Sequence, residues 1–370
     1  MISEKLTTLI VVLNFGSLIL LSFLNFANPL NVNRIANRWF GAFLLIWAGF
    51  WIDEIMLLIF GINLNTLWHF IFRYIQYFAP ILFYYSVVKY SNPGFRIKKV
   101  IFYHLILPVV YFIILYYYYF GGYQLIKINY LLIILMLSQT LYYSLASYIR
   151  IRKHKKAILL FLSQTGEVDL TWLERIIAVL FLIIIMVIFY NIAFSLESLN
   201  LFMNLIILLV IFDVAFHSMK QKEIFPFSNA SREEIISLNE ESDIEEIKKK
   251  IVSDEELVQL KSQLNQFMIN RKIYLDPDLN LVKLADMFAT NPHRLSYIIN
   301  SGFNKNFFNF INYYRVEEAK SLLLNPKMDQ YSILGIAFES GFNSKTSFNN
   351  TFKKITGLTP TDFKKSGSTL

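Results

Sequence analysis

The sequence predicts an all-α protein with two unlike parts: a seven-helix transmembrane domain, then a cytoplasmic domain with two helix-turn-helix units. The 370 residues are 55% hydrophobic and only 17% charged, whereas soluble globular proteins are about 25% charged. Residues 1–219 hold 15 Lys and Arg and 8 Asp and Glu, while residues 220–370 hold 20 and 19. Short capped helices separated by tight turns recur over the last hundred residues. The two parts therefore need separate treatment.

Seven apolar stretches in the first part are long enough to cross a membrane, since about 20 helical residues span the hydrocarbon. Core helices of a soluble protein are excluded because so many apolar stretches would leave no polar face for water. The stretches cover residues 6–27, 39–60, 66–90, 100–120, 128–149, 172–196 and 201–219. We expect residues 1–219 to form the membrane domain.

The Lys and Arg residues between these stretches predict the orientation. Links after the first, third and fifth stretches carry 11 of them, and the opposite links carry only Lys127. This asymmetry places the N-terminus outside and everything after residue 219 in the cytoplasm.

The absence of cysteine excludes thiol catalysis, Cys-ligated zinc and iron–sulfur clusters, and no cofactor or metal site is predicted.

Four of the ionisable residues inside the predicted spans lie near the outer ends of the second and third spans, and an unpaired charge there costs about 2.5–3.5 kcal/mol or more. Asp53 and Glu54 lie near the outer end of the second span, and His69 and Arg73 lie near the outer start of the third. Two interpretations stay open: a paired charge that fixes helix packing, or an outward-facing pocket that binds a small ligand. The spans contain no catalytic motif such as HExxH or paired carboxylates, so we expect no enzyme.

A polar connector at 220–270 follows the spans. Ser253 and Glu256 form a capping box, and an apolar stripe follows at Leu257, Leu260, Leu264 and Phe267. The stripe covers less than two heptads, too short for a convincing coiled coil. It predicts either an amphipathic helix packed on its own neighbouring domain or a dimer helix that relays the state of the membrane domain.

Residues 271–370 predict two helix-turn-helix units joined by one longer helix. In the first unit, Asn280 caps one helix and Asn291 with Pro292 opens a second helix over 293–300. Asn306 caps the longer helix over 307–324. In the second unit, the helices cover 333–339 and 345–354, with Ser332 and Ser344 as caps and a turn at 340–342.

These residues resemble the DNA-binding domain of AraC/XylS-type bacterial transcription regulators. The resemblance covers about 274–365 and depends on the runs 274–281 (YLDPDLNL), 291–296 (NPHRLS), 314–320 (YRVEEAK), 341–344 (GFNS) and 352–354 (FKK), with Gly357, Thr359 and Pro360. It implies that two recognition helices enter successive major grooves of double-stranded DNA.

The resemblance also implies which side chains contact DNA. Base-edge contacts are implied for His293, Ser296, Tyr297, Asn300, Lys345, Thr346, Asn349 and Asn350, and phosphate contacts for Arg294, Lys305, Ser344, Lys353 and Lys354. The chemistry of two residue types agrees, since Asn grips adenine bidentately and Lys reaches guanine O6 and N7. Tyr297 and Asn350 stand where the family often has basic residues, which implies weaker non-specific affinity.

Together these features predict a membrane-anchored one-component transcription regulator of the bacterial cytoplasmic (inner) membrane. Its expected partners are double-stranded DNA, the lipid bilayer and a small-molecule or membrane signal. A second copy of the chain and RNA polymerase are partners that this layout allows. The alternative is a transporter or other membrane protein whose C-terminal domain is a regulatory or partner-binding module.

Overall fold

The computed structural model describes residues 2–95, 101–121, 126–165, 168–193, 201–220 and 253–367. Within these residues the regular elements are helices, apart from one isolated β-bridge between Leu162 and Asn280, and the all-α prediction is confirmed. The chain divides into two compact units. One comprises Met1–Lys153 and Leu170–Ile224, and the other comprises His154–Asp169 and Phe225–Leu370. We call these the N-terminal unit and the C-terminal unit.

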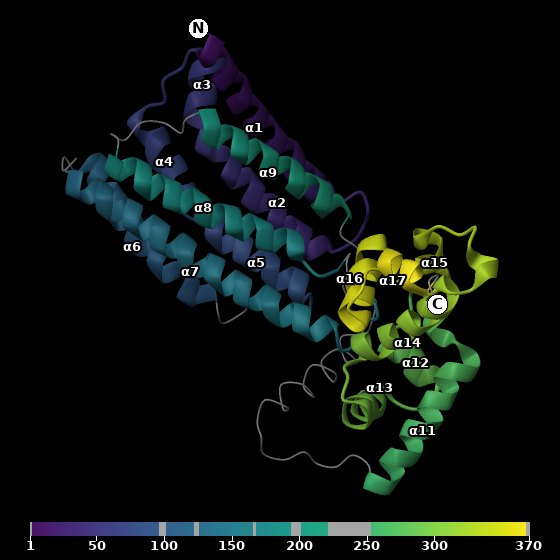
Figure 1. Cartoon of the computed structure of the whole chain (residues 1–370). Helices are drawn as coiled ribbons and strands as arrows, with labels where there is room; N and C mark the ends of the chain where they lie inside the picture. Colours follow the sequence, from purple (N-terminus) through teal and green to yellow (C-terminus); the bar gives the residue numbers. More distant parts are fainter. Residues whose placement is uncertain are drawn as a thin grey trace. The chain divides into compact units, whose positions relative to one another are not determined.

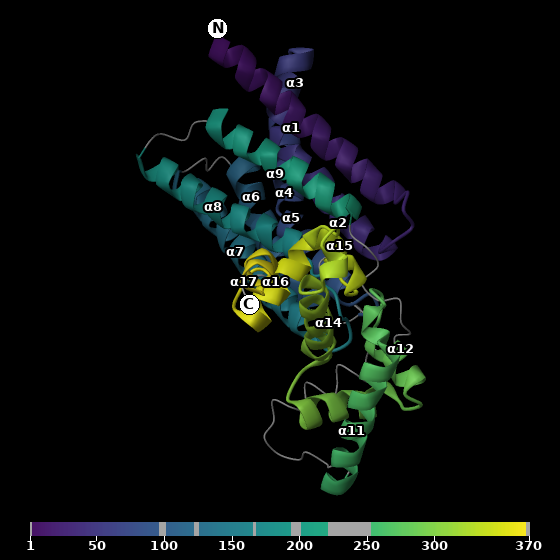
Figure 2. The same ribbon diagram turned by 45° about the vertical axis from the view of Figure 1, so that its right-hand side comes forward.

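The N-terminal unit is a bundle of long apolar helices. Its α-helices are α1 (Ile2–Ala27), α2 (Arg34–Ala48), α3 (Ile52–Phe60), α4 (Thr66–Gln76), α5 (Ala79–Ser91), α6 (Ile101–Phe120), α7 (Ile126–Ile158), α8 (Thr171–Ala193) and α9 (Leu201–Lys220). Helix α1 packs against α2 and α9, and α2 packs against α5. Figures 1 and 2 both show α1 and α9 side by side.

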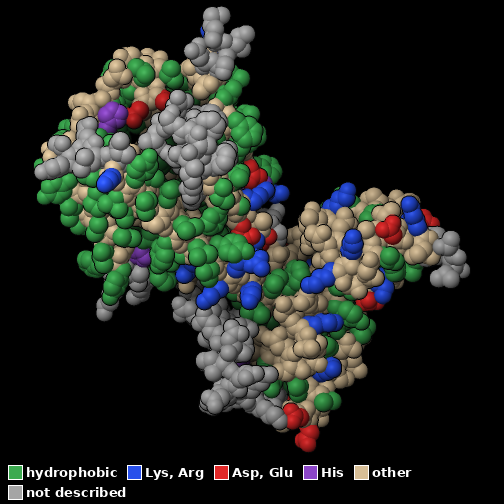
Figure 3. All heavy atoms as spheres, turned by 60° about the vertical axis from the view of Figure 1, so that its left-hand side comes forward, with side chains coloured by type: hydrophobic (Ala, Val, Ile, Leu, Met, Phe, Trp, Pro, Cys, Tyr) green, Lys and Arg blue, Asp and Glu red, His purple; other side chains and the backbone are tan. Residues whose placement is uncertain are grey.

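Five helical stretches among the described residues are long and apolar enough to cross a membrane. They are Lys5–Ala27, Arg34–Phe60, Phe102–Phe120, Lys127–Ile158 and Leu201–Lys220. Large apolar side chains on them point outward, such as Phe23, Ile134 and Leu209, which are 60–65% exposed. Figure 3 shows apolar side chains over most of the visible surface of this unit. Such a surface is consistent with a membrane domain.

The third predicted span, 66–90, is not one continuous helix. It is divided into α4 and α5 by a break at Tyr77 and Phe78. Pro80 explains the break, because proline has no N–H and its ring clashes with the carbonyl four residues earlier. The Tyr77 carbonyl accepts a hydrogen bond from Gln139 Nε2 of α7 at 2.8 Å. The predicted count of seven spans stays a prediction.

Two other predicted spans differ in their limits. The second begins at Arg34 and continues to Phe60 through a 3₁₀ turn, Gly49–Trp51. The fifth continues as α7 to Ile158, so the basic residues after 149 lie on a helix instead of a loop. Residues 221–252 of the predicted connector lie outside the described residues.

The C-terminal unit contains seven α-helices among the described residues. They are α11 (Asp254–Arg271), α12 (Leu281–Met287), α13 (Pro292–Tyr297), α14 (Phe307–Leu323), α15 (Ile333–Glu339), α16 (Lys345–Thr356) and α17 (Pro360–Gly367). The predicted caps are confirmed: side chains of Asn280, Asn291, Asn306, Ser332 and Ser344 each accept a hydrogen bond from a first-turn amide.

Two apolar cores hold this unit together, and α14 contributes to both. Phe310 and Ile311 pack in the first core with α11, α12 and α13, and Val316 and Ala319 pack in the second with α15 and α16. The connector stripe packs against the first core, with Leu264 fully buried. This is the arrangement expected of a helix packed on its own neighbouring domain.

A segment far away in the sequence completes the first core. Residues 154–169, which comprise the last residues of α7 and the link toward α8, belong to the C-terminal unit, and we call them the inserted segment. Its Ile158 and Phe161 are buried among the side chains of α11, α12 and α14. The hydropathy pattern does not indicate that this segment belongs to the C-terminal unit, because it predicts only a link between two membrane spans.

Candidate nucleic-acid interface

The first helix-turn-helix unit consists of α12 and α13. Asn291 Oδ1 accepts a hydrogen bond from the Arg294 amide at 2.7 Å, which fixes the start of α13. Leu295 and Ile298 are fully buried against α12, so the opposite face of α13 points outward. After Tyr297 the chain continues as one π-helical turn, Ile298–Gly302.

Two of the implied base contacts, His293 and Tyr297, are half-buried and share one face of α13 at a spacing of four residues. A third, Asn300, is exposed in the π-helical turn that follows. Ser296 differs: it is only 6% exposed, and its Oγ accepts a hydrogen bond from Asn300 Nδ2 at 3.4 Å. Ser296 lies three residues before Ile299, and residues at this spacing share a buried face.

The second helix-turn-helix unit consists of α15 and α16, joined by the turn at 340–343. Phe348 and Phe352 anchor α16 in the second core. The implied base-contact residues Lys345, Thr346 and Asn350 are exposed, and Asn349 is half-buried. The implied phosphate contacts Lys353 and Lys354 are also exposed. One face of α16 therefore presents amide, hydroxyl and ammonium groups, which are the groups that contact base edges and phosphates in a major groove.

Ser344 contributes to this face mainly through its position. Its Oγ accepts a hydrogen bond from the Ser347 amide at 3.2 Å and so caps α16. The first amides of a helix have no partner within the helix and favour anions. The capped start of α16 is therefore suited to a phosphate group.

Two implied phosphate contacts have partners within the unit. Arg294 forms an ion pair with Glu256 at the start of α11. Lys305 Nζ lies 3.8 Å from the centroid of the Tyr313 ring, and burial lowers the pKa of this lysine. Both side chains are therefore partly engaged within the C-terminal unit.

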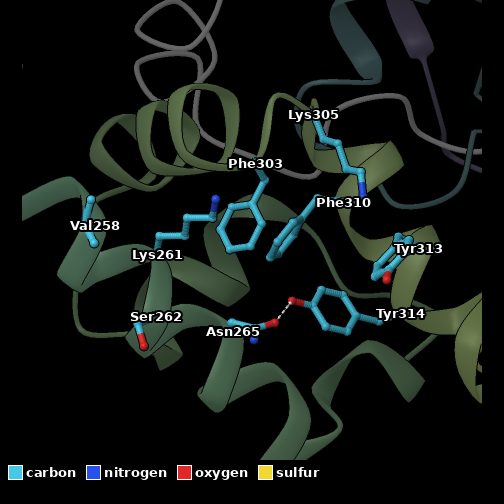
Figure 4. A pocket seen from close by; sticks show the side chains of 9 residues that line it. All are labelled: Val258, Lys261, Ser262, Asn265, Phe303, Lys305, Phe310, Tyr313 and Tyr314. Carbon is cyan, nitrogen blue, oxygen red and sulfur yellow. Dashed lines mark hydrogen bonds between the residues drawn. The ribbon is translucent and has the colours of Figure 1, made fainter. Parts of the chain in front are cut away.

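Lys305 also lines an open pocket of about 530 Å³ between α11 and the start of α14. Figure 4 shows the rings of Phe303 and Phe310 side by side, and the hydroxyl of Tyr314 donating to Asn265 Oδ1 at 2.7 Å. The remaining lining residues are Val258, Lys261, Ser262 and Tyr313. Several polar groups that line this pocket already contact each other, namely Tyr314 with Asn265 and Lys305 with the Tyr313 ring.

Arg315 on α14 is a buried residue that bonds several backbone carbonyls, a role that the sequence did not reveal. Its guanidinium donates to the carbonyl oxygens of Tyr274 and Asp276, both at 2.7 Å, and to that of Ser163 at 3.4 Å. Burial lowers the pKa of Arg315 to about 10, which still leaves the side chain protonated at neutral pH. The family run 314–320 contains this residue, but the run by itself did not indicate these hydrogen bonds.

The four ionisable residues of the predicted outer pocket do not form one cluster. His69 Nδ1 lies 3.3 Å from Asp53 Oδ2, so the pairing of α3 with α4 is present. Arg73 instead donates to Asn129 Oδ1 of α7 at 2.8 Å, and its guanidinium lies 5.7 Å from the centroid of the Tyr118 ring. Glu54 is half-buried beside Asp53.

Comparisons with known proteins agree with the geometry of the C-terminal unit. A family model described as a helix-turn-helix domain matches residues 284–366. A curated protein of Staphylococcus aureus (strain COL), named an uncharacterized HTH-type transcriptional regulator, is 29% identical over 102 residues. These are 28% of this chain and 13% of the relative, so the chain covers only a small part of it. The comparison with solved structures gave no match. Residues 284–366 are thus a helix-turn-helix domain of the AraC type, and the apolar N-terminal helices are consistent with a membrane domain.

Proposed function

We propose that the chain is a membrane-anchored transcription regulator that binds specific double-stranded DNA through α13 and α16. The observation that carries this proposal is the outer face of α16, where Lys345, Thr346, Asn349 and Asn350 lie opposite a buried aromatic anchor. In the first unit, His293, Tyr297 and Asn300 supply the corresponding face. The apolar helices of the N-terminal unit support the anchoring.

The side chains of α16 fit direct readout of a major groove. Asn349 and Asn350 each supply a donor and an acceptor, which match the N6 and N7 edge of adenine. Lys345 supplies a donor for guanine O6 or N7, and Lys353 with Lys354 supplies charge for the phosphates. Ser296 is buried, so we assign no base contact to it.

The first prediction tests sequence-selective binding by the full chain in lipid nanodiscs. Selection from a random duplex library should enrich a defined motif, and binding should weaken steeply with salt. Asn349→Ala should lower the affinity for that motif by about 1–3 kcal/mol and relax the preference at one base pair.

Lys327→Ala, a charge loss in the turn between α14 and α15, provides the control. We expect it to leave the preferred motif unchanged. Enrichment of no motif by the wild-type protein at any salt concentration would contradict the proposed function.

A second prediction concerns the ion pair between Glu256 and Arg294. Glu256→Gln should release Arg294 for a phosphate and tighten DNA binding, by up to about fivefold at low salt, because exposed ion pairs contribute about 1 kcal/mol or less. Fluorescence anisotropy with the enriched duplex measures the change.

Glu255→Gln is the matched control, since it removes the same charge one residue away from the pair. Equal tightening by both variants would assign the effect to long-range charge instead of the release of Arg294.

A third prediction concerns topology. We infer that the N-terminus lies outside and the C-terminal unit lies in the cytoplasm of a bacterium. Protease added to inverted membrane vesicles should cleave the C-terminal unit, whereas intact spheroplasts should protect it. Protection in inverted vesicles would oppose the proposal, because an external domain has no access to the chromosome.

We also infer that the N-terminal unit is the sensor. Within it, Arg73 with its partner Asn129 supports the packing interpretation. The half-exposed Asp53 and His69 pair, with Glu54 beside it, is our candidate for contact with a polar ligand.

A further inference from the structure

The inserted segment supplies two backbone caps to the helix-turn-helix domain. The Phe161 carbonyl accepts a hydrogen bond from the Leu281 amide at the start of α12, and the Leu159 carbonyl accepts one from the Phe308 amide at the start of α14. Both distances are 3.0 Å. First-turn amides have no partner within their own helix, so the segment supplies acceptors for two donors that their own helices leave unpaired.

Ser163 attaches the inserted segment to Leu279 and to α14, the helix that joins the two helix-turn-helix units. Its Oγ donates to the Leu279 carbonyl at 2.6 Å, and its own carbonyl accepts from Asn312 Nδ2 at 3.0 Å and from Arg315. Asn312 and Arg315 are 0% exposed. The segment is therefore held by fully buried donors of α14.

Gln164, the next residue, contacts the second helix-turn-helix unit. Its Nε2 donates to the Gly341 carbonyl at 2.9 Å, and its Oε1 accepts from the Asn343 amide at 3.1 Å. One side-chain amide thus holds both sides of the turn that leads into α16. The same segment therefore grips the first unit through α12 and the second through this turn.

We propose that Gln164 is a positioning residue that sets the register of α16 relative to α13, and hence the spacing of the two DNA contacts. This inference rests on the proposed function and adds its regulation. The inserted segment begins in the last residues of α7 and precedes α8 in the chain, so a displacement of either helix would reach the hydrogen bonds of Gln164 through the covalent chain.

The first test measures the register without DNA. The chain has no cysteine, so Met287→Cys on α12 and Ile355→Cys on α16, both exposed, accept spin labels at defined sites. Electron–electron resonance on the full chain in nanodiscs should give a narrow distance distribution. Adding Gln164→Ala should broaden or shift it, while Thr165→Ala, the neighbouring control, should not.

The second test measures DNA contact. With the duplex enriched by the unlabelled wild-type protein, Gln164→Ala should weaken binding about tenfold, as expected for the loss of two hydrogen bonds. Hydroxyl-radical footprints should lose protection at the base pairs that Asn349→Ala identifies, and should keep it at those that Asn300→Ala identifies. Gln164→Glu retains the acceptor for the Asn343 amide but turns a carboxylate oxygen toward the Gly341 carbonyl oxygen, so it should weaken binding at least as much as Ala.

These tests separate the inference from the proposed function. If the wild-type protein enriches no motif, the proposed function fails, yet the distance measurement still reports on the register. An unchanged distance distribution in Gln164→Ala would overturn the inference, as would a uniform loss of protection over both halves of the site.

Discussion

A polypeptide of residues 253–367 alone should fail to unfold cooperatively, although it contains both helix-turn-helix units. Without the inserted segment it loses Ile158 and Phe161 from the first core, at about 1.5–3 kcal/mol for each side chain. It also loses four hydrogen bonds at about 1 kcal/mol each: those that the Leu159, Phe161 and Ser163 carbonyls accept from Phe308, Leu281 and Asn312, and the one that the Ser163 hydroxyl donates to Leu279. The loss is on the order of 7–10 kcal/mol, as large as the whole stability of many domains.

Circular dichroism during urea unfolding checks this expectation. The fragment alone should give a broad, non-cooperative transition. A synthetic peptide of residues 154–169 added in excess should sharpen the transition and raise the helix signal, because binding to the folded state stabilises it. A sharp transition without the peptide, unchanged when the peptide is added, would contradict the prediction.

Much of the C-terminal unit was predictable because its signals are local. Asn280, Asn291 and Ser344 each cap a helix with a side chain that bonds an amide three residues later, so short windows of sequence contain both partners. The buried and exposed faces of α16 follow from helical spacing in the same way. The turn at 340–342, which contains Gly341, was predictable from a short window of sequence in the same way.

The inserted segment was not predictable, because its contacts join residues far apart in the chain. Gln164 and Asn343 are separated by 179 positions. Leu159 and Phe161 act through backbone carbonyls, which every residue has and which therefore leave no trace in the sequence. In the N-terminal unit the division into α4 and α5 did have a signal in Pro80, but the hydropathy of the stretch concealed it.

Gly341→Ala should be among the most damaging substitutions in the C-terminal unit. Gly341 has φ of +87°, and a Cβ there would lie 2.5 Å from the Tyr274 carbonyl oxygen and 2.9 Å from Leu275 Cα. These are backbone atoms, so no side chain can rotate away and the turn itself must move. We expect a loss of about 3 kcal/mol or more, of which the left-handed conformation accounts for about 1–2.

Gly357→Ala separates these two causes. Gly357 also has a left-handed φ, +80°, but a Cβ there would meet no atom within 4 Å. Hydrogen exchange of the full chain, followed by mass spectrometry of peptides from α15 and α16, should show modest deprotection for Gly357→Ala and far more for Gly341→Ala. Equal deprotection would mean that backbone conformation alone decides. A larger effect of Gly341→Ala would mean that the close approach of this turn to residues 274–275 keeps the second helix-turn-helix unit against the first. Gln164 bonds the same turn at Gly341 and Asn343.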